Sequence, residues 1–176
     1  MNLVLVGYRG TGKSAIARRL GGLLAMPTVS LDNEIVREAG KSISDIVASS
    51  GWSHFRDLEE RICLKFAARA GIIIDCGGGV VEREANLNAL RTGGFVVWLR
   101  ATPTTIVARI GGDRSRPSLT GSKSFTAEVE EVLARREPLY QRLAHVSIDT
   151  DARSLDDLAA AVAIHFRAAA SSGRGT

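Results

Sequence analysis

Residues 7–14, GYRGTGKS, place three glycines, a lysine and a serine directly after the apolar run LVLV. This stretch matches the pattern G-x-x-x-x-G-K-[ST], in which backbone N–H groups wrap around a phosphate chain. Gly7, Gly10 and Gly12 allow that tight wrapping, and a helix that starts near Lys13 adds the positive end of its dipole. The opening of the chain therefore predicts a site for a nucleotide's phosphates.

The end of this loop carries the residues that phosphoryl transfer needs. Thr11 lies inside the predicted nucleotide-binding loop, Lys13 is placed to reach the β- and γ-phosphates, and the Ser14 hydroxyl is a candidate ligand for Mg²⁺. The loop alone fits a GTPase, a motor ATPase or a small-molecule kinase. The N-K-x-D sequence by which a GTPase recognises its base is absent. The short chain, with no appended domain, favours a small kinase.

Composition sets the remaining limits. The chain has 176 residues, of which 45% are hydrophobic and 24% charged, as expected for one globular domain. Arginine supplies 19 of the 23 basic residues and is scattered, which fits separate anion contacts better than a nucleic-acid stripe. Neither a membrane-length apolar run nor a signal-type segment is found. We expect a reduced, cytoplasmic, monomeric protein with no nucleic-acid or membrane partner.

Strand and helix patterns alternate along the chain and predict the α/β class. Five short apolar strands separated by helices imply one parallel sheet with helices on both faces, a three-layer α/β/α arrangement. Ser44 is a plausible N-cap, and Gly40 a helix stop. The expected strands are 2–7, 27–32, 72–79, 95–101 and 145–151, and the expected helices are 12–25, 33–40, 42–51, 52–71, 82–94, 102–112, 126–144 and 154–169.

The domain is expected to span residues 1–168, with a disordered tail at 169–176. Ligands of such sheets bind at the carboxyl ends of the strands. Gly7, Asp32 and the glycines at 77–79 follow the first three strands, so they are expected to meet at one edge.

Six segments together resemble the shikimate kinase family over about residues 1–166. They are GYRGTGKS, LDNEIVREAGKSISDI, HFRDLEE, CGGGVV, RSRP and RREPLYQRLA. The resemblance implies a five-stranded fold like that of nucleoside monophosphate kinases, with a mobile lid. It also implies Mg²⁺-dependent transfer of the γ-phosphoryl group of ATP to the 3-hydroxyl of shikimate. That reaction is a step toward chorismate and the aromatic amino acids.

The resemblance also assigns the substrate site. Arg56 and Arg136 match the family's two arginines that clamp the shikimate carboxylate, a planar fork meeting a planar anion. Asp32 matches the aspartate that accepts hydrogen bonds from the substrate hydroxyls, close to the one that attacks. Glu59 matches the glutamate that fixes the first arginine. The matching backbone that lies against the substrate comprises Gly77, Gly78 and Gly79.

On the nucleotide side, the resemblance points to a lid at residues 111–123. Arg116 matches the lid arginine that reaches the phosphates, and lid closure would exclude water. Arg109 matches the residue that stacks on adenine, and Arg153 lies in the rest of the adenine loop. Leu155 stands where the family often has proline on the other side of the base.

The metal site departs from the family. The usual D-x-D after the second strand is SLD here, so Ser30 occupies the first acidic position. Asp75 instead ends the apolar strand IIID, where many members have a small residue. We hypothesise an exchange, in which Asp75 supplies the acidic group near Mg²⁺ and Ser30 the small polar one. The alternative is that Asp75 only caps the glycine turn.

Other interpretations stay open from the sequence alone. Arg56 and Glu59 would also suit a solvated ion pair on a helix, and Asp32 a simple N-cap. A kinase for another polyol acid, such as gluconate, and a P-loop ATPase that acts on a partner are the rival functions. The first should lack the two clamp arginines, which are present here.

Overall fold

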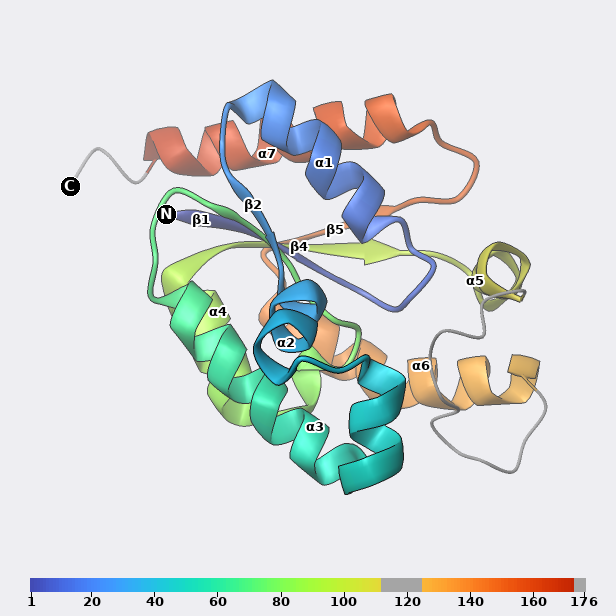
Figure 1. Cartoon of the computed structure of the whole chain (residues 1–176). Helices are drawn as coiled ribbons and strands as arrows, with labels where there is room; N and C mark the ends of the chain where they lie inside the picture. The colour runs from blue at the N-terminus through green and yellow to red at the C-terminus, as the bar shows by residue number, and fades with distance from the viewer. Residues whose placement is uncertain (112–124, 173–176) are drawn as a thin grey trace.

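The structure is a computed structural model that describes residues 1–111 and 125–172. Five parallel strands form its sheet in the order β2-β3-β1-β4-β5 (Figure 1), which confirms the predicted fold class. The strands are β1 (Asn2–Val6), β2 (Thr28–Ser30), β3 (Ile73–Asp75), β4 (Gly94–Arg100) and β5 (Val146–Asp149). The helices are α1 (Lys13–Leu24), α2 (Leu31–Ala39), α3 (Ile43–Ala67), α4 (Glu84–Gly93), α5 (Pro103–Ile110), α6 (Phe125–Leu143) and α7 (Leu155–Ser172), with a 3₁₀ turn η1 (Val80–Glu82).

Alternation along β1 produces two cores, one on each face of the sheet. Leu3 and Leu5 pack with residues of α1 and α7, whereas Val4 and Val6 pack with residues of α2, α3, α4 and α6. Figure 1 shows α1 and α7 above the sheet and α2, α3, α4 and α6 below it. Because strand β1 is buried on both faces, it is apolar from Leu3 to Val6.

The boundaries of several elements differ from the expectations. Strand β2 stops at Ser30, whose side chain caps α2 by accepting from Asn33 N, so Asp32 lies in the first turn of a helix rather than on a strand. Ser42, not Ser44, caps α3. The expected break between two helices is real: Gly51 has φ 78° and ψ 170° inside α3.

The C-terminal helix is longer than expected. Helix α7 continues to Ser172, so the expectation of a disordered tail from residue 169 is wrong for residues 169–172. Residues 173–176 and most of the expected lid, including Arg116, lie outside the described residues. Among the helices that the structure describes, none is long and apolar enough to cross a bilayer.

Candidate active site

The phosphate loop joins β1 to α1 and is shaped by its own hydrogen bonds. Gly12 precedes α1 with φ 89°, a left-handed conformation that glycine adopts without strain. Thr11 Oγ1 donates to the Tyr8 carbonyl over 2.8 Å, so this side chain stabilises the loop from inside. Lys13 Nζ donates to the same carbonyl, also over 2.8 Å. The lysine is therefore held at the inner side of the loop.

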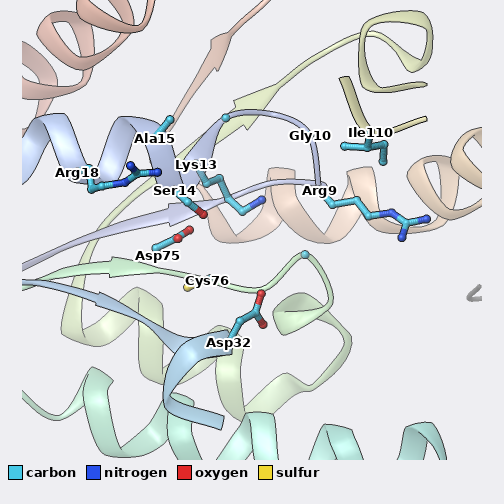
Figure 2. A pocket seen from close by; sticks show the side chains of 12 residues that line it. Arg9, Gly10, Lys13, Ser14, Ala15, Arg18, Asp32, Asp75, Cys76 and Ile110 are labelled. Carbon is cyan, nitrogen blue, oxygen red and sulfur yellow. The ribbon is translucent and has the colours of Figure 1, made fainter. Parts of the chain in front are cut away.

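A cleft of about 400 Å³ opens between the phosphate loop and the ends of β2 and β3. Its lining includes Lys13, Ser14, Asp32, Asp75 and Gly78, and Figure 2 shows both aspartates turned toward the loop. The adjoining cleft shares Ser14, Asp32 and Asp75 and adds Ser30. The structure thus brings the predicted phosphate, metal and substrate residues to one edge of the sheet.

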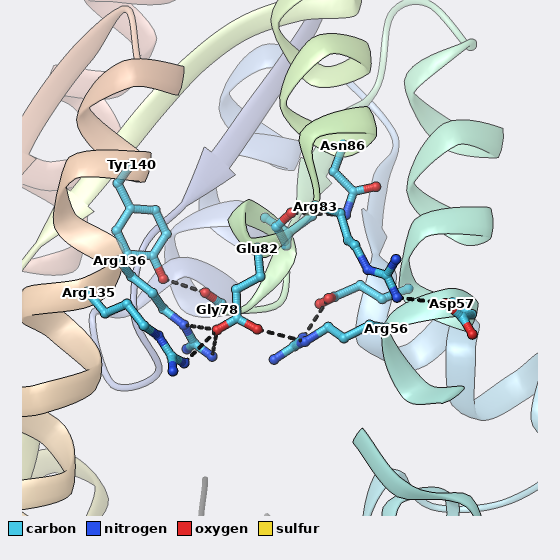
Figure 3. A network of polar contacts seen from close by, with 11 residues as sticks. Arg56, Asp57, Gly78, Glu82, Arg83, Asn86, Arg135, Arg136 and Tyr140 are labelled. Atoms are coloured by element: carbon cyan, nitrogen blue, oxygen red, sulfur yellow. Dashed lines mark hydrogen bonds and ion pairs between the residues drawn. The ribbon is translucent and has the colours of Figure 1, made fainter. Parts of the chain in front are cut away.

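The two predicted clamp arginines come from different helices and meet beside the glycine segment. Arg56 on α3 and Arg136 on α6 are both buried. Both contact the carboxylate of Glu82, at 3.0 Å from Arg56 Nε and 2.8 Å from Arg136 Nη2 (Figure 3). Arg56 Nη1 also donates to Glu59 Oε2 over 2.6 Å. The expected Arg56–Glu59 pair is present, and its burial shows that it is no solvated surface pair.

The glycine segment after β3 is where these side chains converge. A Cβ added at Gly79 would lie 2.2 Å from both terminal nitrogens of Arg56. A Cβ added at Gly77 would lie 2.7 Å from Asp32 Oδ1 and 2.9 Å from Glu59 Oε1. Real Cβ atoms do not approach neighbours so closely, so only glycine leaves room for the guanidinium and the two carboxyl groups. The backbone wall for the substrate expected at residues 77–79 stays a prediction, and the structure shows that Gly77 and Gly79 leave room for the protein's own side chains.

The pKa values of the two carboxyl groups beside the clamp arginines, Glu59 and Glu82, are shifted in opposite directions. Burial raises the pKa of the Glu59 carboxyl, although the neighbouring Arg56 opposes the shift. Partial burial acts in the same direction on Glu82, but the charges of Arg136 and Arg56 outweigh it and hold the pKa of that carboxyl below its ordinary value. Glu82 is therefore ionised at neutral pH.

The predicted adenine side lies at the outer edge of the phosphate loop. Arg109 donates to the Gly10 carbonyl over 3.2 Å and to the Thr150 carbonyl over 2.9 Å, which ties α5 to the loop and to the end of β5. Leu155 lies beside Gly12, since a Cβ there would be 3.9 Å from Leu155 Cδ2. Arg153 is exposed in the turn before α7. The structure thus places Arg109 and Leu155 beside the phosphate loop, and Arg153 lies two residues before Leu155 in the chain.

Sequence reasoning missed two residues of the site, Glu82 and Tyr140. The Tyr140 hydroxyl donates to the Gly78 carbonyl and ties α6 to the glycine segment (Figure 3). Its place in the segment RREPLYQRLA, four residues after Arg136, was the available signal. Glu82 had no such signal, because its contacts join three separate parts of the chain.

Comparisons with known proteins place this arrangement in a family. The sequence model described as "Shikimate kinase" matches residues 9–166. A shikimate kinase of Rhodopirellula baltica is 44% identical over 89% of this chain and 86% of its own length. A shikimate kinase of Symbiobacterium thermophilum is 40% identical over 92% of this chain and 94% of its own length. The structure of a shikimate kinase from Acinetobacter baumannii in complex with shikimate has a TM-score of 0.88 and 30% identity, covering 92% of this chain and 89% of that one. The chain therefore belongs to the shikimate kinase family.

Proposed function

We propose that this protein transfers the γ-phosphoryl group of ATP to the 3-hydroxyl of shikimate. Family membership supports the reaction, and one structural observation supports the substrate. Arg56 and Arg136, from different helices, already surround one carboxylate, that of Glu82. A site that holds a carboxylate between two guanidinium groups suits an acid such as shikimate.

The remaining substrate contacts follow from the cleft. Asp32 lines it and lies close to Gly77, where it would accept hydrogen bonds from the substrate hydroxyls and orient the attacking one. Gly77, Gly78 and Gly79 would form the backbone wall of the site, and Glu59 would act through Arg56 as a positioning residue. Tyr140 would hold this wall in place through Gly78.

The nucleotide would lie along the phosphate loop. Backbone N–H groups of the loop and the N-terminus of α1 would bind its phosphates, and Lys13 would stabilise the charge that develops during transfer. Arg109, with Leu155 and Arg153 nearby, would contact the base. A lid at residues 111–123 that carries Arg116 to the phosphates stays a prediction from the sequence, as do the cytoplasmic location and the monomeric state.

Ser14 and Asp75 fit a magnesium site. Magnesium takes oxygen ligands and keeps several waters, so one hydroxyl and one carboxylate beside the phosphates suffice. Both residues line the same cleft, and Asp75 is only 5% exposed at the end of β3. Across the described residues, no cluster of three or more His, Cys, Asp or Glu offers another site. When bound there, Mg²⁺ would neutralise charge on the transferred phosphoryl group.

The neighbouring strand supports the proposed exchange of metal residues. Ser30 on β2 pairs in register with Asp75 on β3 and lines the adjoining cleft. Asp75 also begins the sequence D-x-x-G, residues 75–78, at the end of a strand next to the phosphate-loop strand. This is the place of a Walker-B-type acid.

A coupled assay of ADP release tests the function. The purified protein with Mg-ATP should release ADP when shikimate is added, and little with gluconate or with no acceptor. Release that needs no acceptor would favour the ATPase interpretation. Release that depends on gluconate would reject shikimate as the substrate.

A further inference from the structure

The carboxylate between the clamp arginines is part of the protein. Glu82 Oε2 lies 3.0 Å from Arg56 Nε, and Glu82 Oε1 lies 2.9 Å from Arg136 Nε and 2.8 Å from Arg136 Nη2. Arg135 Nη2 is 2.9 Å from the same Oε1 (Figure 3). One carboxylate thus satisfies donors of both arginines that would otherwise meet a substrate acid.

Glu82 is more exposed to solvent than the two arginines that it contacts. It is the last residue of the short 3₁₀ turn η1, and its side chain is 25% exposed, whereas those of Arg56 and Arg136 are only 10% and 4% exposed. Each arginine also has a contact besides Glu82, and Arg136 Cζ lies 5.9 Å from the centroid of the Tyr8 ring. Arg56 pairs with Glu59 and lies 5.4 Å from the Trp52 ring. Both arginines therefore have partners other than Glu82, and the Glu82 carboxylate is more accessible to solvent than either of them.

We propose that Glu82 occupies the subsite of the substrate carboxylate while the site is empty, and that shikimate displaces it on binding. This inference rests on the proposed function. Its consequence is selectivity, because a ligand must offer an equivalent carboxylate to replace the contacts that Glu82 gives up. A neutral ligand of the same shape leaves Glu82 in place and gains nothing from the two arginines.

Arg135 supplies the destination for the displaced group. Its side chain is 63% exposed, and it already contacts Glu82. A carboxylate that leaves Arg56 and Arg136 therefore keeps one cationic partner and gains water, so its charge is never buried alone. The clamp itself stays charge-balanced, since the substrate brings one negative charge for the one that leaves.

The test compares Glu82→Gln with the control Glu84→Gln. Glu84, two residues further along the chain, pairs with Arg142 and has no contact with the clamp. Calorimetry without nucleotide measures the Kd of shikimate and of its methyl ester, which lacks the negative charge. Steady-state kinetics then separates KM from kcat.

Glu82→Gln should bind shikimate roughly three- to thirtyfold more tightly than the wild type. In the variant, no carboxylate of the protein competes with the substrate for the two arginines. KM for shikimate should fall with little change in kcat. Affinity for the methyl ester should not rise, and Glu84→Gln should match the wild type. As an independent check, Arg135→Ala should weaken shikimate binding, because Glu82 then lacks its second partner.

Unchanged or weaker shikimate binding by Glu82→Gln would overturn the inference and show that Glu82 holds the arginines for the substrate. An equal gain in affinity for the methyl ester would also overturn the inference, because it would mean that the substitution loosens the site for any ligand. If the wild type bound no shikimate at all, the proposed function itself would fail, and the inference with it.

Discussion

Arg56 and Glu59 stand one turn apart on α3 and form a buried ion pair, with 2.6 Å between Nη1 and Oε2. Their side chains are 10% and 1% exposed. Burying a carboxylate so completely is costly, and the raised pKa of Glu59 reflects that cost. Such a pair is poor evidence for a purely stabilising role. We infer that its task is to orient Arg56.

The first prediction concerns this positioning. Glu59→Gln should raise the KM for shikimate about tenfold, because Arg56 loses its fixed partner, while the KM for ATP stays nearly unchanged. The thermal midpoint should not fall greatly, since the neutral amide avoids the burial of a charge. A matched control is Glu60→Gln, which alters the neighbouring residue of the same helix. An unchanged KM in Glu59→Gln would assign the pair to the fold alone.

The raised pKa of Glu59 also predicts how the free energy of unfolding depends on pH. A carboxyl whose pKa is raised by folding holds its proton in the native state after the unfolded chain has lost it. The free energy of unfolding contributed by Glu59 therefore falls as the pH rises from the ordinary value of 4.5 to the raised pKa, and is constant above it. Chemical denaturation across this window should show the downward slope in the wild type and not in Glu59→Gln.

Removing either clamp arginine should weaken shikimate binding, but the two variants should differ in the stability of the fold. Arg56→Ala and Arg136→Ala should each raise the KM for shikimate by roughly ten- to a hundredfold, the effect of losing a charge-assisted contact. Only Arg56→Ala should also destabilise the fold strongly, because it leaves Glu59 buried without its cation. In Arg136→Ala, Glu82 keeps Arg56 and Arg135.

Steady-state kinetics and thermal unfolding check both halves of this prediction. The control is Arg83→Ala, which removes an arginine near the clamp that pairs with Asp57 instead. Unchanged shikimate kinetics in both clamp variants would reject the assignment of the carboxylate subsite.

A further prediction concerns Lys13 and the chemical step. Lys13→Ala should lower kcat by at least about a hundredfold, since it removes a charge aimed at the transition state. The hydrogen bond from Lys13 Nζ to the neutral Tyr8 carbonyl contributes little to stability, so circular dichroism should still show a folded protein. Lys65→Ala, on the outer surface of α3, is the matched control. Near-normal turnover by Lys13→Ala would remove the lysine from the mechanism.

Local signals predicted most of the fold. The buried strand β1 and the phosphate loop are marked by apolar runs and glycine spacing, and Gly51 marked the break in α3 because only glycine suits its φ of 78°. The boundary at β2 was misplaced, because Ser30 and Asp32 suit a strand end and a helix start equally well. Ser30 is the last residue that pairs with β3, and the strand ends there because the Ser30 side chain caps α2.

The site residues that lie in family motifs could be predicted from the sequence. Those that reach the site only through tertiary packing could not. Arg56 and Arg136 stand 80 positions apart in the sequence, and the family pattern alone joined them. Glu82 falls in a 3₁₀ turn where a helix had been expected, and its role arises from contacts with α3 and α6 that no spacing reveals. Contacts between charged residues that are far apart in the sequence leave no local sequence pattern.

The last prediction tests the exchange between Ser30 and Asp75. Asp75→Ser should raise the Mg²⁺ concentration for half-maximal turnover by about tenfold or more, as loss of a carboxylate near a metal typically does. Calorimetry should show weaker binding of Mg-ADP with little change for ADP alone. Adding Ser30→Asp should restore a good part of both, because the two side chains are neighbours in register and line one cleft with Ser14.

The rescue is a clean test because of what Ser30 does in the fold. Its hydroxyl caps α2 by accepting from Asn33 N, and aspartate caps helices equally well, so Ser30→Asp should leave the thermal midpoint nearly unchanged. The control is Ser42→Asp in the Asp75→Ser background, which adds the same charge at the N-cap of α3 and should restore nothing. Equal recovery in the control would mean that any added carboxylate suffices. Unaltered Mg²⁺ dependence in Asp75→Ser would mean that Asp75 only stabilises the turn into the glycine segment, and that another oxygen beside Ser14 faces the metal.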